Sequence, residues 1–166
     1  MLINPDAKTL ELARQVIDSG GYGYTPQQAA DIPAIIAAKN RYFWCIDHRL
    51  FDMMPDVFTE TGFQSYWQGR PGYTDPQLQA AQNAATCGPD MVPQHFGYNH
   101  MVQFLPDGTA RLLTRLHDLH TYRDDGSQYS GYGFYVDDLV KCSDGRWRIQ
   151  TLRLSYYRTE GTLRNK

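Results

Sequence analysis

Four long runs rich in β-branched and aromatic residues fill the second half of the chain, at 93–105, 110–122, 130–141 and 146–157. A turn signal separates each run from the next, namely PDG at 106–108, DDG at 124–126 and SDG at 143–145. Tight turns of this kind join strands that lie side by side and run in opposite directions. The pattern therefore predicts a meander of long antiparallel strands.

The first half of the chain has the patterns of helices. Residues 1–20 carry an apolar stripe with helical spacing, which Gly20-Gly21 ends. Asp31, with Pro33 two places further on, predicts the start of a longer main helix. That helix stays apolar along one face and ends near Asp47.

Helices that precede a curved sheet indicate an α+β fold, in which the sheet wraps the main helix and leaves a cavity at one end. A second short helix is expected around 50–58, and 69–90 is expected to be loop, short helix and loop. A chain of 166 residues has the length of one domain. We divide it into an N-terminal helical extension (1–24), an α+β domain (25–160) and a tail (161–166).

Composition narrows the class of partner. The formal net charge is −2, and no basic stripe suited to a phosphate backbone is present, so nucleic acid is not expected as a partner. No apolar run approaches the roughly 20 residues of a membrane span, and residues 1–20 lack a secretory apolar region, which predicts a cytoplasmic protein. Cys45, Cys87 and Cys142 have no CxxC spacing, so neither a zinc site nor a disulfide framework is expected. A small molecule is the expected partner.

The side chains with catalytic potential follow from strand alternation, because every second residue of a strand faces the same side. His95 should share a face with Gly97, Asn99, Met101 and Gln103, and His120 with Leu112, Thr114, Leu116, Asp118 and Tyr122. If these are the concave faces, His95, Asn99, Asp118 and His120 line one pocket. His100 and His117 should then face the other way, so a metal site is not expected.

The main helix should contribute a carboxylate to this pocket. Asp47 follows Phe43 by four residues and so lies on the apolar stripe. A carboxylate there is costly unless a group donates a hydrogen bond to it, and a histidine N–H is a suitable donor. A single strand histidine is more often a packing group than a catalyst, whereas two inward histidines and a buried aspartate make catalysis an equal alternative. Asp118 could equally pair with Arg115 or Arg123.

Four segments together carry a family resemblance: RYFWCIDHRLFDMMPDVFTETG, PQHFGYN, DGTARLLTRLHDLHTYR and DGRWRI. They resemble the SnoaL-like branch of the nuclear transport factor 2-like superfamily, in which scytalone dehydratase and bile acid 7α-dehydratase are most similar. The resemblance covers about 31–157. It implies a cone-shaped α+β barrel, made of a curved and mostly antiparallel sheet around the N-terminal helices.

The resemblance also implies roles for individual residues. Similarity to scytalone dehydratase assigns catalytic roles to Asp47, Tyr66, His95 and His120. The tyrosine that this family places just before the aspartate is Ile46 here, and a polar residue on its penultimate strand is Val136. Similarity to bile acid dehydratase adds Tyr42, Asp118 and an arginine of the last strand, either Arg158 or Arg153.

These residues lead to one main functional hypothesis: a cofactor-free lyase that removes water from a cyclic or polyketide-like hydroxy-carbonyl compound. His95, held by Asp47, would take the proton α to the carbonyl, His120 would protonate the leaving hydroxyl, and Tyr66 and Tyr42 would hold the carbonyl oxygen. Which histidine is the base stays open. The residues expected to contact substrate are Asn99, Asp118, Met101, Phe96, Leu116, Phe134 and Arg158.

Two alternatives use the same sequence features. A polyketide cyclase or an isomerase would use the same dyad without loss of water, and the mass of the product separates them from a dehydratase. A non-catalytic binding module would instead bury His95 away from any opening or leave it without a bond to Asp47. A homo-oligomer, either trimer or dimer, is expected because Leu113, His117 and Leu119 fall on an apolar convex face.

Overall fold

The structure is a computed structural model that describes residues 1–19 and 21–164. Within them the helices are α1 (Ala7–Ser19), α2 (Pro26–Asp47) and α3 (Pro76–Thr86), with a short 3-10 helix, η1 (Met54–Val57). The strands are β1 (Gln64–Trp67), β2 (Arg70–Pro71), β3 (Met91–Phe104), β4 (Ala110–Tyr122), β5 (Gln128–Lys141) and β6 (Trp147–Gly161). The predicted α+β class is confirmed. The predicted helix stop at Gly20 and the end of the predicted tail, 165–166, lie outside the described residues.

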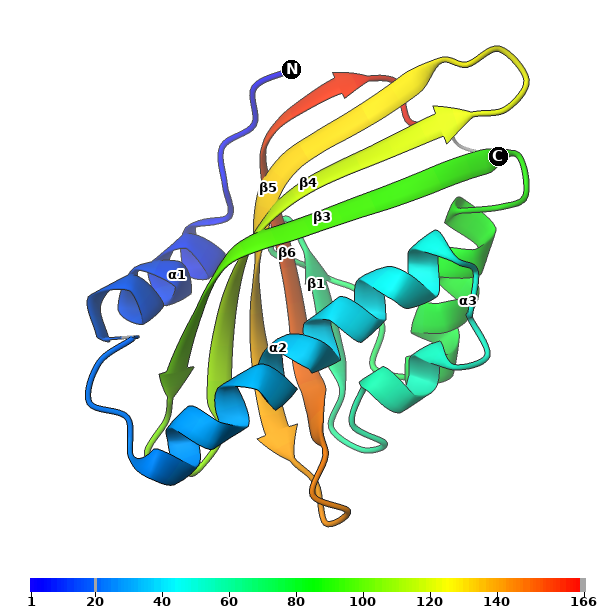
Figure 1. Cartoon of the computed structure of the whole chain (residues 1–166). Coiled ribbons are helices and arrows are strands. Elements are labelled where there is room, and N and C mark those ends of the chain that lie inside the picture. The colour runs from blue at the N-terminus through cyan, green and yellow to red at the C-terminus, as the bar shows by residue number, and fades with distance from the viewer. Residues whose placement is uncertain (20, 165–166) are drawn as a thin grey trace.

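The strands form a curved sheet that does not close, in the order β2-β1-β6-β5-β4-β3 (Figure 1). The four long strands pair antiparallel with their neighbours in the chain, as the meander prediction requires. β1 adds to the outer side of β6 in parallel, which makes the sheet mixed. α2 crosses in front of this curved sheet, and α3 lies beside it.

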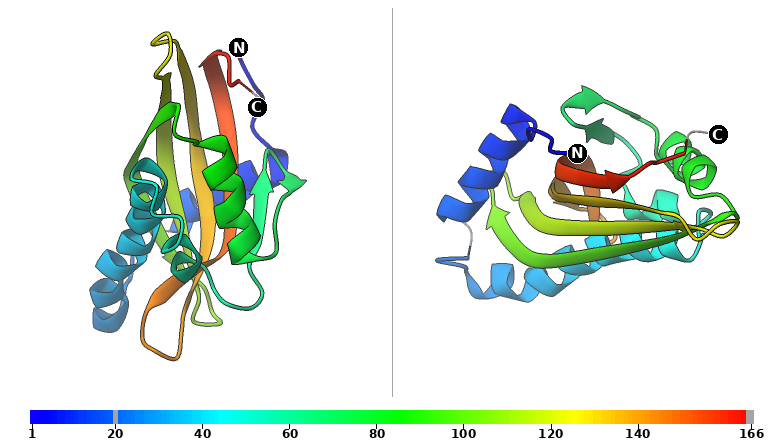
Figure 2. Two further views of the ribbon diagram at one scale, coloured as in Figure 1. Left: turned by 90° about the vertical axis from the view of Figure 1, so that its right-hand side faces the viewer. Right: turned by 90° about the horizontal axis from the view of Figure 1, so that it is seen from above.

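Helices cover both faces of the sheet (Figure 2). α2 lies across the concave face and packs mainly against β3, while α3 packs beside η1. α1 lies against the opposite face, where Ala13 joins a cluster with Phe134 and Val136. Leu113, expected on an exposed convex face, packs at the edge of this cluster, so α1 covers part of that face. None of the described helices is long and apolar enough to cross a membrane.

α2 begins earlier than the sequence predicted. Thr25 is the N-cap: its hydroxyl accepts a hydrogen bond from the backbone N–H of Gln28 (3.2 Å), and the Gln28 side chain accepts one from the backbone N–H of Thr25 (3.0 Å). This capping box satisfies two backbone donors at the true start of the helix. The prediction that Asp31 and Pro33 open the helix was wrong, because Pro33 stands inside it.

A β-bulge in β3 changes which side chains face the core. Asn99 and His100 together lie opposite Thr114, and Asn99 has a positive φ of 53°. The extra residue inverts the alternation beyond it. Val102 is therefore buried where Met101 was expected, and the ring nitrogen Nδ1 of His100 lies 3.0 Å from the hydroxyl of inward-facing Thr114. The predictions that Asn99, Met101 and Gln103 share a face with His95, and that His100 faces the other way, were wrong.

Gly97 allows α2 to approach β3 at the site of the dyad. A side chain at this position would overlap the ring of Phe43, a residue of α2. That ring stacks on His95, with centroids 5.6 Å apart and an interplanar angle of 12°. A glycine on β3 thus fixes the distance between the helix and the strand that carries His95.

We predict that Gly97→Ala lowers the free energy of unfolding by about 1–3 kcal/mol, since overpacking a close contact costs that much. Urea unfolding of the wild type and the variant measures it. In a Phe43→Leu background the same glycine substitution should cost less, because the smaller side chain relieves the overlap. An equal cost in both backgrounds would contradict this explanation.

Candidate active site

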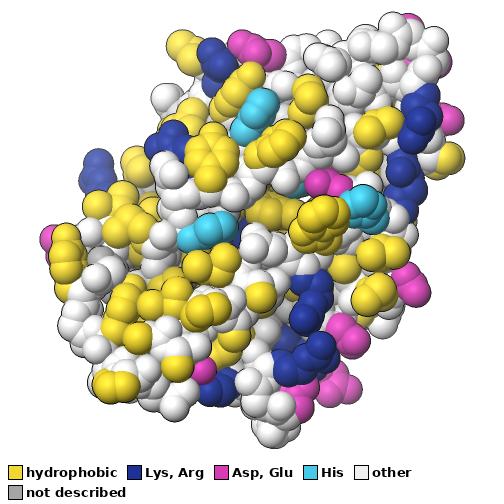
Figure 3. Space-filling model, viewed as in Figure 1, with side chains coloured by type: hydrophobic (Ala, Val, Ile, Leu, Met, Phe, Trp, Pro, Cys, Tyr) yellow, Lys and Arg dark blue, Asp and Glu magenta, His cyan; other side chains and the backbone are white. Residues whose placement is uncertain are grey.

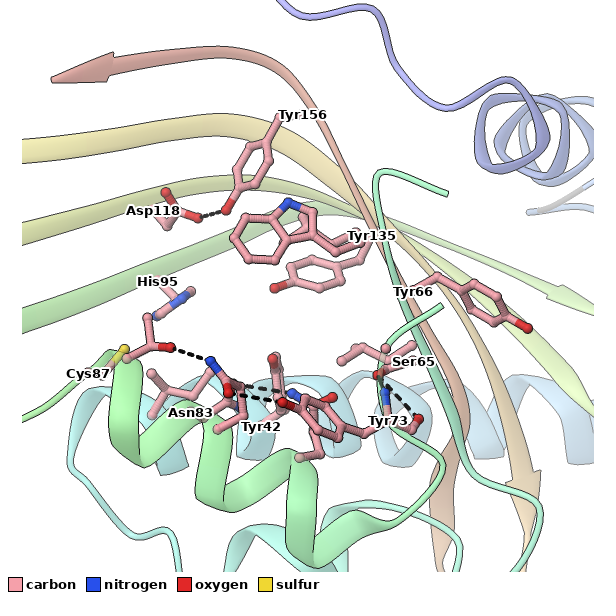
Figure 4. Close-up of a pocket in the computed structure, with 18 of the residues that line it drawn as sticks. Tyr42, Ser65, Tyr66, Tyr73, Asn83, Cys87, His95, Asp118, Tyr135 and Tyr156 are labelled. Atoms are coloured by element: carbon pink, nitrogen blue, oxygen red, sulfur yellow. Dashed lines mark hydrogen bonds between the residues drawn. The ribbon is translucent and has the colours of Figure 1, made fainter. Parts of the chain in front are cut away.

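A cavity of about 330 Å³ lies between the concave face of the sheet, α2 and α3 (Figure 4). Histidine, aspartate and tyrosine side chains from the long strands form one part of its wall: His95, Asp118, His120, Tyr129, Tyr135 and Tyr156. Uncharged polar side chains from the β1–β2 region and α3 form another part: Ser65, Tyr73, Gln79, Gln82 and Asn83. The volume is in the range of small-molecule sites.

Asp47 and His95 form a bidentate pair. The Nδ1 atom of His95 lies 2.7 Å from one carboxylate oxygen of Asp47, and the backbone N–H of His95 donates to the other oxygen at 2.9 Å. Asp47 is the last residue of α2, so this pair ties the helix end to β3. Because Nδ1 faces Asp47, the opposite nitrogen, Nε2, is the one that can reach a ligand in the cavity that His95 lines.

The far side of Asp47 faces an outer groove between α2 and β3, on the face shown in Figure 3. Hydrophobic side chains and histidines gather there, including exposed Trp44, which stacks on His48. The carboxylate keeps 21% of its side-chain exposure, while the His95 side chain keeps 7%. The dyad thus has its carboxylate toward solvent and its imidazole toward the cavity.

His120 lies beside His95 in the cavity wall. The two rings meet edge to face, with centroids 5.5 Å apart. Burial lowers the pKa of His120 to about 4, although nearby Asp118 acts in the opposite direction. Nδ1 of His120 lies 4.0 Å from an oxygen of Asp118, and neither atom has a hydrogen-bond partner among the described residues. His120 is therefore a neutral imidazole at pH 7.

Asp118 belongs to the cavity and not to a surface ion pair. Its second oxygen accepts a hydrogen bond from the hydroxyl of Tyr156. The two arginines considered as partners lie elsewhere: Arg115 stands over the ring of Tyr157, and Arg123 donates to the carbonyl of Pro89. Burial, together with the charge of Asp118, raises the pKa of Tyr156 well above its usual value.

The two tyrosines predicted for the carbonyl oxygen have different positions. Tyr42 is buried in the cavity wall, where its ring meets that of Tyr135 edge to face. Tyr66 also borders the cavity, but its ring points away from it, and its hydroxyl donates to Gln64 at 2.9 Å (Figure 4). Its neighbour Ser65 is buried in the wall instead, because successive side chains of β1 alternate. The structure thus brings Tyr42, but not the Tyr66 phenol, to the dyad's cavity.

Of the residues predicted to contact substrate, Asp118 lines the cavity, and six others do not: Asn99, Met101, Phe96, Leu116, Phe134 and Arg158. The bulge displaces the first two from the face of His95. Phe134 packs under α1 on the opposite face of the sheet, and Arg158 lies over the ring of Tyr132. Arg153, the other arginine considered, pairs with Asp138 at 2.7 Å.

The cavity suits an uncharged ligand. No lysine or arginine appears among its described lining residues, so a carboxylate or phosphate group would find no cationic partner there. Burial raises the pKa of Cys87 to about 12, which keeps this lining thiol protonated. In the described part of the chain, no three His, Cys, Asp or Glu side chains gather closely enough to hold a metal ion.

Sequence reasoning missed three tyrosines of the wall, Tyr129, Tyr135 and Tyr156. A chain with 12 tyrosines gives no signal for any one of them. The face of Tyr156 depends on a register shift between β5 and β6, whereas β4 and β5 pair without a shift and place Tyr129 and Tyr135 opposite inward-facing His120 and Thr114. Tyr129 could have been found from the pairing of β4 and β5, because it lies directly opposite His120.

Comparison with known structures gives the same fold. A candidate scytalone dehydratase from Novosphingobium aromaticivorans superposes with a TM-score of 0.71 at 19% identity, over 83% of this chain and 90% of that one. A hexachlorocyclohexane dehydrochlorinase from Novosphingobium barchaimii gives 0.70 at 14% identity, over 81% and 91%. ActVI-ORFA from Streptomyces coelicolor gives 0.66 at 13% identity, over 77% and 96%.

At these identities the structural likeness establishes the fold alone. The sequence comparison is more specific, because the model of the SnoaL-like domain matches residues 27–153, which is most of the chain. The matched range contains both members of the Asp47–His95 pair as well as His120 and Asp118. The chain therefore belongs to the SnoaL-like domain family.

Proposed function

We propose that this protein is a cofactor-free lyase that removes water from an uncharged, cyclic β-hydroxy carbonyl compound. The observation that carries this proposal is the Asp47–His95 pair, whose imidazole lines the wall of a ligand-sized cavity. Two of the structural neighbours are named for eliminations, as a candidate dehydratase and a dehydrochlorinase. That likeness supports the reaction class, while the substrate is inferred from this chain's own cavity.

In the first step, Nε2 of His95 takes the proton α to the substrate carbonyl. Asp47 accepts the Nδ1–H bond, which fixes the tautomer with a free Nε2 and stabilises the imidazolium that forms. The hydrogen bond from the backbone N–H of His95 to the same carboxylate fixes the position of Asp47 relative to the imidazole. The C–H electrons move into an enolate, whose oxygen needs a hydrogen-bond donor.

In the second step, the Cβ–O bond breaks and water leaves. His95, now protonated, returns its proton to the departing hydroxyl, while the enolate electrons form the C=C bond and restore the carbonyl. The pKa of His120, near 4, makes it a poor source of this proton at pH 7. We therefore assign to His120 and Asp118 the binding of the hydroxyl, in place of the acid role predicted from sequence, because each has an unpaired polar atom there.

A cyclase or an isomerase would use the same base. A binding module has less support, since it would bury His95 away from any opening or separate it from Asp47, whereas His95 lines the cavity and bonds Asp47. Product mass distinguishes the enzymatic alternatives, because only dehydration lowers it by one water.

We predict that Asp47→Asn and His95→Asn each lower kcat/KM by about 100-fold to 10,000-fold, the contribution of a general base. A suitable probe is β-hydroxytetralone, a neutral bicyclic ketone whose dehydration yields the fluorescent product α-naphthol. One- and three-ring β-hydroxy ketones extend the panel.

His48→Asn is the matched control, because His48 is exposed next to Asp47 and should leave turnover unchanged. Near-normal turnover in the His95 and Asp47 variants would refute the assignment of the base. A product of unchanged mass, or no turnover of any ketone in the panel, would refute the dehydratase reaction.

His120 should also make stability depend on pH. The unfolded chain binds a proton at this residue below its ordinary pKa of about 6.5, but the folded protein binds it only below about 4. The free energy of unfolding should therefore fall as the pH drops from 6.5 to 4, by roughly 3 kcal/mol from this residue. Urea unfolding at pH 7 and pH 4 measures the fall. His120→Asn should reduce it by that amount, and an identical fall in both proteins would contradict the burial of a neutral His120.

A further inference from the structure

A buried ion pair lies next to the cavity and has no part in the proton transfers above. Nζ of Lys39, on α2, is 3.0 Å from a carboxylate oxygen of Asp137, on β5, and both side chains are fully buried. Desolvation makes such a pair expensive, and an apolar pair of the same volume is often as stable or more stable. The pair therefore requires an explanation beyond packing.

The ammonium group of Lys39 is surrounded by aromatic rings of the cavity wall. Its Nζ atom lies 3.1 Å from the ring centroid of Tyr135 and 4.7 Å from that of Tyr42. Both tyrosines line the cavity, and their rings meet edge to face with centroids 6.1 Å apart. Figure 4 shows the Tyr135 hydroxyl pointing into the cavity, toward the side that holds His95. The cation thus stands behind a pair of phenols whose oxygens reach the ligand space.

A cation on the face of a phenol ring attracts the ring's electron density. Burial raises the pKa of Tyr135 well above its usual value, so the hydroxyl stays protonated. The cation behind the ring makes that O–H group a stronger hydrogen-bond donor to an anion. The effect is large where water is excluded, because the effective dielectric constant is low. Asp137 keeps the cation in place: burial lowers the pKa of Lys39 to about 8, and the facing carboxylate limits the fall, so Lys39 stays protonated at pH 7.

We infer that the Lys39–Asp137 pair turns the Tyr135 and Tyr42 hydroxyls into an oxyanion site, which binds the enolate oxygen of the substrate. Tyr135 is then a catalytic residue that touches the reacting oxygen, and Lys39 is a positioning residue that acts through it. This inference rests on the proposed function, since an enolate forms only if a base removes the α proton. It also defines a ligand class: planar, uncharged carbonyl compounds that develop an enolate oxygen in the site, with phenolates as mimics of that enolate.

The probe for this site is para-nitrophenol, because the absorbance of its phenolate differs from that of the neutral phenol. The wild-type protein should bind the phenolate in preference to para-nitroanisole, which has the same ring and nitro group but a methyl group in place of the ionisable proton. The test variant is Lys39→Met with Asp137→Leu, which removes both charges together, so that neither is left buried without the other. It also removes the acceptor of a 3.4 Å hydrogen bond from the backbone N–H of Arg153. Phenolate affinity should fall about 10-fold in this variant, while para-nitroanisole affinity and the melting temperature stay near the wild-type values.

A second variant shows whether Lys39 acts through Tyr135. Tyr135→Phe alone should weaken phenolate binding by 10-fold or more, and adding the Lys39 and Asp137 substitutions should then cause little further loss. With β-hydroxytetralone, the charge-removed variant should lose kcat and keep KM, since the interaction forms only as the enolate develops.

Unchanged phenolate affinity in the charge-removed variant would overturn the inference and leave the pair a purely structural one. If that variant does not fold, unchanged phenolate affinity in Tyr135→Phe overturns it equally. Either failure leaves the base assignment standing, because His95→Asn and Asp47→Asn test that assignment through turnover. Loss of turnover in those variants with unchanged phenolate binding separates the two claims.

Discussion

The contact between the end of α2 and β3 organises this molecule. Asp47 accepts two hydrogen bonds from His95, one from the ring and one from the backbone, so it serves both as a structural tie and as the partner of a base. Gly97 allows the approach, and Phe43 covers the imidazole that results. The energy that holds the helix to the sheet thus also fixes the imidazole. A catalyst needs that precision, because general-base efficiency depends on placement at hydrogen-bond distance.

The elements that could be predicted from sequence are those with unbroken periodicity. The alternation along β4 runs its full length, so the inward positions of Asp118 and His120 follow from the sequence alone. The apolar stripe of α2 likewise predicts that Asp47 faces inward, and the tight turns predict the order of the four long strands. Once α2 is placed across the concave face of that sheet, the pairing of Asp47 with His95 follows.

The features that could not be predicted depend on places where the periodicity of a strand or helix is interrupted. The bulge at Asn99–His100 moves Met101 off the expected face, and a register shift between β5 and β6 brings Tyr156 into the wall. β1 has only four residues and pairs in parallel with β6, which leaves too little alternation to orient Tyr66. Lys39 did carry a signal, because it interrupts the apolar stripe of α2 four residues before Phe43.

The central claim is that His95, held by Asp47, removes a proton α to a carbonyl. The most direct measurement is deuterium exchange of α-tetralone in D2O, followed by NMR, because this ketone has α protons but no hydroxyl to lose. The wild-type protein should speed exchange at the α carbon well above the buffer rate, and His95→Asn and Asp47→Asn should return it to that rate. Exchange at the buffer rate with the wild type, or unchanged exchange in both variants, would contradict the claim.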